Sequence, residues 1–294
     1  MNIHFSAPSK TFLTGEYAVL CGGPALVLNT SPRFELKAVR GESGVAGIPD
    51  GSPASQWIKQ RAPLLADWKI EFSDPHQGQG GFGASSAQFL FVHALTTLLQ
   101  ISVSRAVEGL DLPALLADFK VLSGGQASGA DLLAQATGQV AIVKGSAAHG
   151  EAWPFPDLDF AVIRTGNKVQ THLHLAELDR RPLEALIAPA HVTADCFAAG
   201  SVEKFLHSVK AYGTALRELH LQAPSTLSLL KRIEDQPWCK ATKGCGALGA
   251  DTILVFFNYE DREAATRYLA EAKLMTMASS ADLCEGLQMK WNWS

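Results

Sequence analysis

Residues 78–87 read Gly78-Gln79-Gly80-Gly81-Phe82-Gly83-Ala84-Ser85-Ser86-Ala87, and they lead directly into an apolar segment that extends to Ile101. Glycines at this density cannot continue a helix, whereas Ala84–Ile101 is apolar nearly all round a helical projection, which predicts a helix buried on every side. Glycines let backbone N–H groups converge on an anion, and the start of a helix adds unpaired N–H donors and a positive dipole end. The stretch therefore predicts an anion-binding loop; the alternative is a glycine-rich turn whose serines only cap a helix.

Strands and helices follow one another along the rest of the chain without strict βαβ alternation, which predicts an α+β fold. Residues 1–45 read as strands, and Gly41–Pro53 is a loop by composition. Further helices are predicted at Leu112–Lys120, Ala130–Ala136, Leu183–Ala199, Val202–Leu221, Ser225–Ile233 and Asp261–Leu274. Further strands are predicted at Val140–Val143, Leu158–Ile163, Thr171–Leu175 and Thr252–Phe257.

The composition is that of an ordinary globular protein, with 294 residues of which 47% are hydrophobic and 18% charged. The net charge of −4 gives no sign of a nucleic-acid or membrane-surface partner. There is no signal-peptide profile and no apolar run long enough to span a membrane. Five scattered cysteines without a Cys-x-x-Cys pair favour a reducing, cytoplasmic location. An acidic chain that binds anions must place its cations locally.

Three other segments carry residues that could act on a bound phosphate. Lys10 lies between apolar strand residues and is followed by the carboxylate of Glu16, so its ammonium faces either a cleft or solvent. Asp131 begins a helix, where it either complements the helix dipole or accepts a proton from a substrate hydroxyl. The glycine segment Lys243–Gly249 precedes a strand and is by itself consistent with a simple tight turn.

Together and in this order, the four segments resemble the motifs of the GHMP kinases, the superfamily named for galactokinase, homoserine, mevalonate and phosphomevalonate kinases. Pro8–Leu20 is similar to the first motif, Gly81–Ala87 to the second and Lys243–Gly249 to the third. Ser128-Gly129-Ala130-Asp131 is similar to the family's Ser-Gly-x-Asp segment. The resemblance implies an α+β, two-lobed fold with an ATP-binding lobe at 1–153, a second lobe at 154–294 and the active site between them.

The resemblance also implies a role for each matching residue. Nucleotide phosphates would lie on Gly80, Gly81, Gly83, Ala84, Ser85 and Ser86, with ATP and Mg²⁺ as cofactors and Ser85 as a ligand of the metal. Asp131 and Lys10 would be catalytic: Asp131 orients or deprotonates the acceptor hydroxyl, and Lys10 lies between Asp131 and the transferring phosphoryl group. The small-molecule acceptor would contact Lys10, Glu16, Tyr17, Ser128, Gly244 and Gly246. The sequence leaves open whether the protein forms a homodimer.

The acceptor is less well defined than the reaction. Tyr17 after Glu16 is similar to phosphomevalonate kinases, whereas Gly22-Gly23-Pro24-Ala25 and the short chain are more similar to mevalonate kinases. This narrowly favours 5-phosphomevalonate, an intermediate of isoprenoid precursor synthesis, with mevalonate as the alternative. A non-catalytic ligand sensor and a diphosphomevalonate decarboxylase also stay open. A phosphorylated acceptor needs local cations, for which the candidates are Lys120, Lys168, Lys204 and Lys243.

Two departures from the family pattern concern the glycine motifs. No proline leads the second motif. In the third, Gly244-Cys245-Gly246-Ala247-Leu248-Gly249 replaces an uninterrupted glycine-rich run. We therefore expect the backbone of the third loop to differ from the usual one, while the reacting groups lie in the other motifs.

Overall fold

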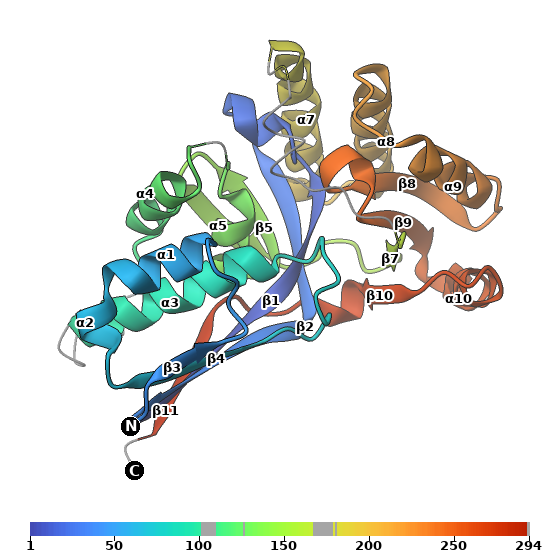
Figure 1. The fold of residues 1–294 in the computed structure, drawn as a ribbon. Coiled ribbons are helices and arrows are strands. Elements are labelled where there is room, and N and C mark those ends of the chain that lie inside the picture. Colours follow the sequence, from blue (N-terminus) through green and yellow to red (C-terminus); the bar gives the residue numbers. More distant parts are fainter. Residues whose placement is uncertain (101–109, 126, 167–178, 180, 293–294) are drawn as a thin grey trace.

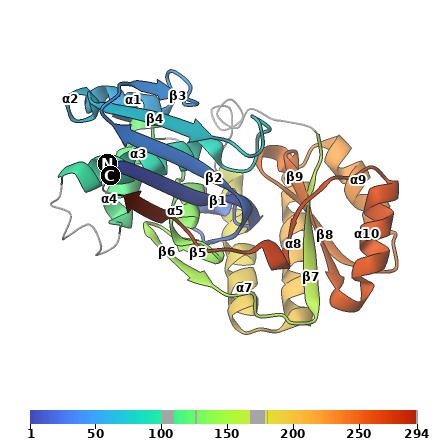
Figure 2. The ribbon, with the colours of Figure 1, turned by 90° about the horizontal axis from the view of Figure 1, so that it is seen from below.

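The computed structural model describes residues 1–100, 110–125, 127–166, 179 and 181–292. Within these residues the chain forms two β-sheets with helices packed around them, one group on each side of the long central strands (Figure 1). Viewed at right angles, the two groups lie side by side as separate lobes (Figure 2). The predicted α+β, two-lobed architecture is confirmed.

The first lobe is built on a seven-stranded sheet among the described residues. Its strands are β1 (Asn2–Thr14), β2 (Ala25–Arg40), β3 (Gly44–Ala46), β4 (Trp68–Ser73), β5 (Val140–Lys144), β6 (Ala147–Glu151) and β11 (Gln288–Asn292). The order is β11-β1-β2-β4-β3, with β5 paired to β2 and β6 to β5. The helices of this lobe are α1 (Pro53–Gln60), α2 (Ala62–Leu65), α3 (Ala84–Gln100), α4 (Leu112–Leu122) and α5 (Ala130–Thr137).

The second lobe is built on a four-stranded sheet in the order β10-β7-β9-β8. Its strands are β7 (Leu158–Arg164), β8 (Cys239–Cys245), β9 (Thr252–Asn258) and β10 (Thr276–Ser279). Its helices are α7 (Ile187–Ala198), α8 (Val202–Glu218), α9 (Pro224–Glu234) and α10 (Arg262–Glu271). Short 3₁₀ helices lie at Ala18–Cys21, Arg181–Leu186, Ala247–Gly249, Tyr259–Asp261 and Ser280–Asp282. No helix in the described part of the chain has the length and apolar character needed to cross a bilayer.

Burial along the strands explains how the two lobes meet. In the first half of β1, exposed or half-buried residues alternate with buried Ile3 and Phe5, as expected for a sheet with one covered face. From Ala7 onward nearly every residue is buried, because β8 and α8 of the second lobe also contact this strand. The second lobe's own sheet is covered on both faces: Phe256 belongs to the core shared with the first lobe, whereas Val255 packs with α9 and α10.

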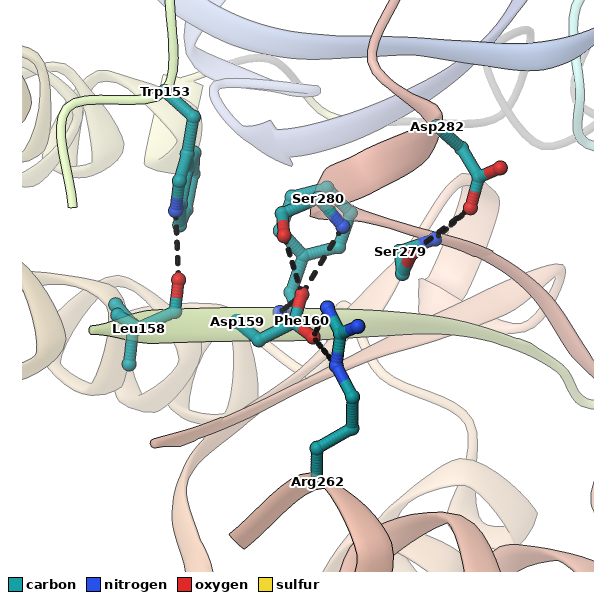
Figure 3. Close-up of polar contacts among 8 residues, drawn as sticks. All are labelled: Trp153, Leu158, Asp159, Phe160, Arg262, Ser279, Ser280 and Asp282. Atoms are coloured by element: carbon teal, nitrogen blue, oxygen red, sulfur yellow. Dashed lines mark hydrogen bonds and ion pairs between the residues drawn. The ribbon is translucent and has the colours of Figure 1, made fainter. Parts of the chain in front are cut away.

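The connection from β10 to β11 carries the chain from the second sheet to the first, and one buried carboxylate holds its beginning (Figure 3). Asp159 of β7 accepts hydrogen bonds from the backbone N–H of Ser280 (3.1 Å) and from its hydroxyl (2.6 Å). Its other oxygen accepts from Nε of Arg262, at the start of α10, at 2.8 Å. Ser31 of β2 donates to Asp282 at 3.2 Å, so the same short segment is tied to both sheets.

Several predicted elements have different limits in the structure. Gly41–Pro53 is not wholly loop, since it contains β3 and its last residue begins α1. Leu183–Ala199 is a 3₁₀ helix followed by α7, because Pro189 lacks the N–H that an uninterrupted helix would need. The sequence analysis missed α1, α2, β4, β6, β8 and β10. The strand predicted at Thr171–Leu175 lies outside the described residues.

Asp159→Asn should lower the free energy of unfolding by about 2–4 kcal/mol, because a buried carboxylate that accepts charged and neutral hydrogen bonds cannot be replaced by an amide without unpaired groups. Urea unfolding of the whole chain measures this. Asp261→Asn is the matched control: this carboxylate is 31% exposed and lies 3.8 Å from Lys240, so its loss should cost less than about 1 kcal/mol. Equal effects of the two substitutions would contradict the assigned role of Asp159.

Candidate functional site

A cavity of about 780 Å³ lies between the two lobes. Twelve of the thirteen residues assigned to a site by the motif resemblance line it: Lys10, Glu16, Tyr17, Gly80, Gly81, Gly83, Ala84, Ser85, Ser86, Ser128, Asp131 and Gly246. Gly244 is not among the lining residues: it lies in β8, where a Cβ would approach Gly249 and Thr226 within about 3 Å. The fold thus brings segments that are far apart in sequence to a single cavity.

The glycine loop at residues 78–83 is fixed to β1 by backbone and ring contacts. The N–H of Lys10 donates to the carbonyl of Phe82 at 2.9 Å. The Phe82 ring stacks on His76 with a centroid distance of 4.1 Å, and His76 Nε2 lies 2.6 Å from the hydroxyl of Ser9. Burial lowers the pKa of His76 below its ordinary value, so the imidazole is neutral at pH 7. The loop is therefore anchored by its only aromatic residue.

Two glycines of this loop stand where no side chain fits. Gly83 has φ +96°, and a Cβ there would lie 2.8 Å from both the Gln135 amide nitrogen and Cγ of Lys10. Gly81 has φ +100°, and its Cβ would lie 2.7 Å from Cβ of Asp251 in the second lobe. The positive φ and the close approach of neighbours both require glycine. These positions let the backbone of the loop lie directly against β1, α5 and the second lobe.

Helix α3 begins where the glycine loop ends, and its first-turn N–H groups have no acceptor within the helix. The Ser85 side chain is exposed at this point and lines the cavity. The Ser86 side chain is buried: its hydroxyl lies 2.9 Å from the Gly83 carbonyl and 2.6 Å from Oε1 of Gln135. The nucleotide role predicted for Ser86 is thus restricted to its backbone, since the hydroxyl is used within the protein.

Lys10 and Asp131 reach the cavity from different elements. Lys10 is half-buried in β1, with its Nζ 5.1 Å from the ring centroid of Phe12, another cavity residue. Asp131 lies in the first turn of α5, where its Oδ1 accepts the N–H of Leu132 at 3.0 Å. Gly129 precedes the first residue of α5 and has φ +73°, a left-handed conformation that favours glycine, and it lines the cavity together with Asp131.

Glu16 and Lys243 form a buried ion pair between the lobes. The side chain of Glu16 is 6% exposed and that of Lys243 is 0% exposed. Burial raises the pKa of Glu16 above its ordinary value, and the charge of Lys243 opposes this rise. Burial acts to lower the pKa of Lys243, yet the neighbouring Cys245 and the Glu16 carboxylate hold it above its ordinary value. Lys243, expected to bind an anionic acceptor, instead neutralises a carboxylate of the protein.

The third glycine motif is shorter than predicted, because Lys243–Cys245 belong to β8 and only residues 246–249 form the turn. Leu248 occupies the left-handed region with φ +53°, which is unusual for a branched side chain. Its N–H donates to the hydroxyl oxygen of Tyr17 at 2.9 Å, and its carbonyl accepts from the N–H of Ala223 at 2.8 Å. These two hydrogen bonds hold Leu248 in a left-handed conformation that glycine would adopt without strain.

Burial determines the reactivity of the Cys245 thiol, because the residue is 1% exposed. Loss of solvent raises the pKa of its thiol to about 11, so a reactive thiolate is disfavoured at neutral pH.

The structure adds functional residues that the sequence analysis did not find. Asp74 and Asp251 line the cavity as carboxylates, and Gln79 lines it as an amide. Gln135 is fully buried and joins α5 to the Pro8 carbonyl of β1 at 2.8 Å. Asp74 was detectable, since it caps the turn by accepting the N–H groups of His76 and Gly78 at 2.8 Å, a common Asx-turn pattern.

The oxygen donors around the cavity suit Mg²⁺, which prefers hydroxyl, carboxylate and phosphate oxygens. Ser85 supplies a hydroxyl, and Asp131 and Asp251 supply carboxylates. No group of three or more histidines, cysteines or acidic residues in the described part of the chain could hold a metal alone. A magnesium ion here would take most of its ligands from nucleotide phosphates and water, with Ser85 as the protein ligand that fits.

The other lysines proposed for an anionic acceptor do not line the cavity. Lys120 and Lys204 are exposed on α4 and α8, respectively. Lys168 lies outside the described residues. Among the described lining residues, Lys10 is therefore the single cation.

Comparisons with known proteins give matches in structure alone, since no family model and no curated protein sequence matches the chain. The fold is similar to phosphomevalonate kinase from Streptococcus pneumoniae in complex with phosphomevalonate and AMPPNP, with 16% identity, a TM-score of 0.76 and coverage of 94% of this chain and 98% of that one. It is also similar to galactokinase from Lactococcus lactis complexed with galactose, with 12% identity, a TM-score of 0.76 and coverage of 98% and 95%.

Mevalonate kinase from Methanococcus jannaschii matches with 12% identity, a TM-score of 0.68 and coverage of 94% and 97%. The chain has the GHMP kinase fold. Because these small-molecule kinases act on acceptors as different as a sugar and a phosphorylated acid, the likeness identifies the GHMP kinase architecture and leaves the acceptor open.

Gly83→Ala should destabilise the protein by about 2–4 kcal/mol and weaken nucleotide binding, because it adds strain at positive φ to a collision with Gln135 and Lys10. Gly78→Ala is the control on the same loop: Gly78 has φ +76° with nothing within 4 Å of its Cβ, so only the strain of about 1–2 kcal/mol should remain. Urea unfolding of both variants separates the two effects. If Gly83→Ala is as stable as Gly78→Ala, the prediction is wrong, because Gln135 and Lys10 then make room for the added Cβ without loss of stability.

Lys243→Met should lower the free energy of unfolding by about 3–5 kcal/mol at neutral pH, because Glu16 is left buried without its cation. The pKa of Glu16 is already raised in the folded protein and rises further in this variant. Because the pKa of Glu16 is higher in the folded than in the unfolded state, the free energy of unfolding falls as the pH rises through the folded pKa. The loss of stability in Lys243→Met should therefore narrow as the pH falls toward 4.5. Urea unfolding at several pH values measures it.

Lys240→Met provides the control, since Lys240 lies on the same strand but is 33% exposed and 3.8 Å from Asp261. Its loss should cost less than about 1 kcal/mol at every pH. A pH-independent deficit in Lys243→Met would mean that lost packing, rather than the charge of Glu16, determines the effect.

Proposed function

We propose that the protein is an ATP-dependent kinase that transfers a phosphoryl group to a hydroxyl of a small acceptor. The observation that carries this proposal is that one inter-lobe cavity is lined by the glycine loop at the start of α3, by Lys10 and by Asp131. Phosphoryl transfer requires positioning and neutralisation of charge more than covalent chemistry, and this set of groups supplies both.

Each group has a distinct role in the proposed reaction. Backbone N–H groups of the glycine loop and the first turn of α3 bind the nucleotide phosphates. Asp131 accepts the proton of the acceptor hydroxyl, whose oxygen forms a bond to the γ-phosphorus as the bond from that phosphorus to the bridging oxygen of ADP breaks. Lys10 stabilises the negative charge of the phosphoryl group in transfer. Mg²⁺, when bound beside Ser85, supplies further neutralisation of the phosphate oxygens.

For the acceptor, we propose a small anionic molecule, with 5-phosphomevalonate as first candidate and mevalonate as second. Support comes from the likeness to a phosphomevalonate kinase bound to phosphomevalonate and from Tyr17 beside the third glycine loop. Galactose and homoserine belong in any test, because a galactokinase and a homoserine kinase are also similar in fold. Release of ADP with each of the four acceptors would identify the substrate, and no ADP release with any of them would favour a ligand sensor.

Asp131→Asn should lower turnover by about 10²–10⁴-fold while leaving the Kd for AMPPNP nearly unchanged, because the amide cannot accept the hydroxyl proton. Steady-state ADP release and calorimetry measure the two quantities. Asp195→Asn is the control, since Asp195 is exposed on α7 and does not line the cavity. Near-normal turnover by Asp131→Asn would remove this residue from the mechanism.

A further inference from the structure

The charges around the cavity are strongly unbalanced for a site that binds phosphates. Four carboxylates line it, those of Glu16, Asp74, Asp131 and Asp251, whereas Lys10 is the only cation among the described lining residues. Lys243 lies behind the wall and is committed to Glu16. A nucleotide triphosphate in this cavity would therefore meet more negative than positive charge from the described lining residues, even with Glu16 neutralised by Lys243. A further protein cation near the glycine loop would add to the neutralisation that Mg²⁺ supplies.

Arg164 is placed to supply that cation. It is the last residue of β7 in the second lobe, and its Nη1 donates to Oε1 of Gln79 at 2.5 Å. Gln79 belongs to the glycine loop and lines the cavity. The loop and the end of β7 approach each other from opposite lobes (Figure 2). The guanidinium therefore stands at the rim of the cavity, next to the segment proposed to hold phosphates.

The positive charge of the Arg164 guanidinium is not balanced by a carboxylate of the described residues. No carboxylate in the described part of the chain lies within ion-pair distance of it, in contrast to Arg181 and Arg262, which pair with Asp179 and Asp159. A guanidinium has five N–H donors and is always protonated, and a neutral amide oxygen uses one donor without balancing the charge. Burial is the main cause of the lowered pKa of His76, but the charge of Arg164 contributes to it, so its field reaches the base of the loop.

We infer that Arg164 binds a phosphate oxyanion at the rim of the cavity, with Gln79 orienting its guanidinium. This rests on the proposed kinase function and extends it by naming a phosphate-binding residue in the second lobe. The phosphate belongs either to the end of the nucleotide or to a phosphorylated acceptor. An arginine that joins the second lobe to a phosphate on the first would stabilise the arrangement in which both walls contact the ligand.

The test compares three variants by calorimetry with AMPPNP, ADP and adenosine, and by the KM of the acceptor in ADP release. Arg164→Gln removes the charge but keeps an amide donor toward Gln79. Gln79→Ala keeps the charge and removes the contact. Arg217→Gln is the matched control, because Arg217 is exposed on α8 and donates to the Thr214 hydroxyl at 3.0 Å, away from the cavity.

We expect Arg164→Gln to weaken either AMPPNP binding or the acceptor KM by about ten- to a hundredfold, while adenosine binding stays unchanged. A loss for AMPPNP without a loss for ADP identifies the terminal phosphate of the nucleotide. A rise in the acceptor KM alone identifies the acceptor's phosphate. Gln79→Ala should lose less than Arg164→Gln, and Arg217→Gln should match the wild type.

The inference is wrong if Arg164→Gln matches the wild type in every measurement, or if Gln79→Ala reproduces its full loss, since Arg164 would then only support the loop. A failure of the proposed function looks different. In that case the wild-type protein releases no ADP with any acceptor, and nucleotide binding by Arg164→Gln still decides the role of the arginine. A wild-type protein without affinity for AMPPNP or ADP would contradict both.

Discussion

The contact between strand β1 and the glycine loop is the constraint on which the rest of the site depends. The amide of Lys10 donates to the Phe82 carbonyl, so the strand that carries the lysine also sets the position of the loop. Gln135 completes the join by bonding to the Pro8 carbonyl and to the Ser86 hydroxyl. Three elements far apart in sequence thus share one small polar junction, and the glycine at position 83 leaves room for it.

Much of the fold and of the site could be predicted, because the decisive signals are local. The glycine-dense loop and the apolar helix after it are visible in a single stretch of sequence, and α3 begins at Ala84 as expected. The predicted lobe boundary near residue 153 stays a prediction. Partners that are distant in the chain could not be found in this way: the charge of Lys243 is plain in the sequence, but its carboxylate partner lies 227 positions earlier.

Neutral groups were the hardest to assign. Gln135 sits inside a helix as one amide among apolar residues, and nothing in its neighbours reveals that it bridges β1 and α3. The irregular third motif was noticed, but its effect was not predictable. Leu248 adopts a left-handed conformation because the Tyr17 hydroxyl and the Ala223 N–H hold its peptide groups. The consequence is a turn that keeps its place beside the cavity without the usual run of glycines.

The pairing of β11 with β1 has a consequence for how the protein is made. The ribosome makes β1 before β11, and until β11 is made the edge of β1 that it occupies presents unpaired N–H and C=O groups. All described residues that line the cavity, up to Asp251, precede β11 in the chain. A nascent polypeptide halted after Asp251 would therefore contain the cavity's whole described lining and still leave this edge of β1 unpaired, until β11 is made and covers it.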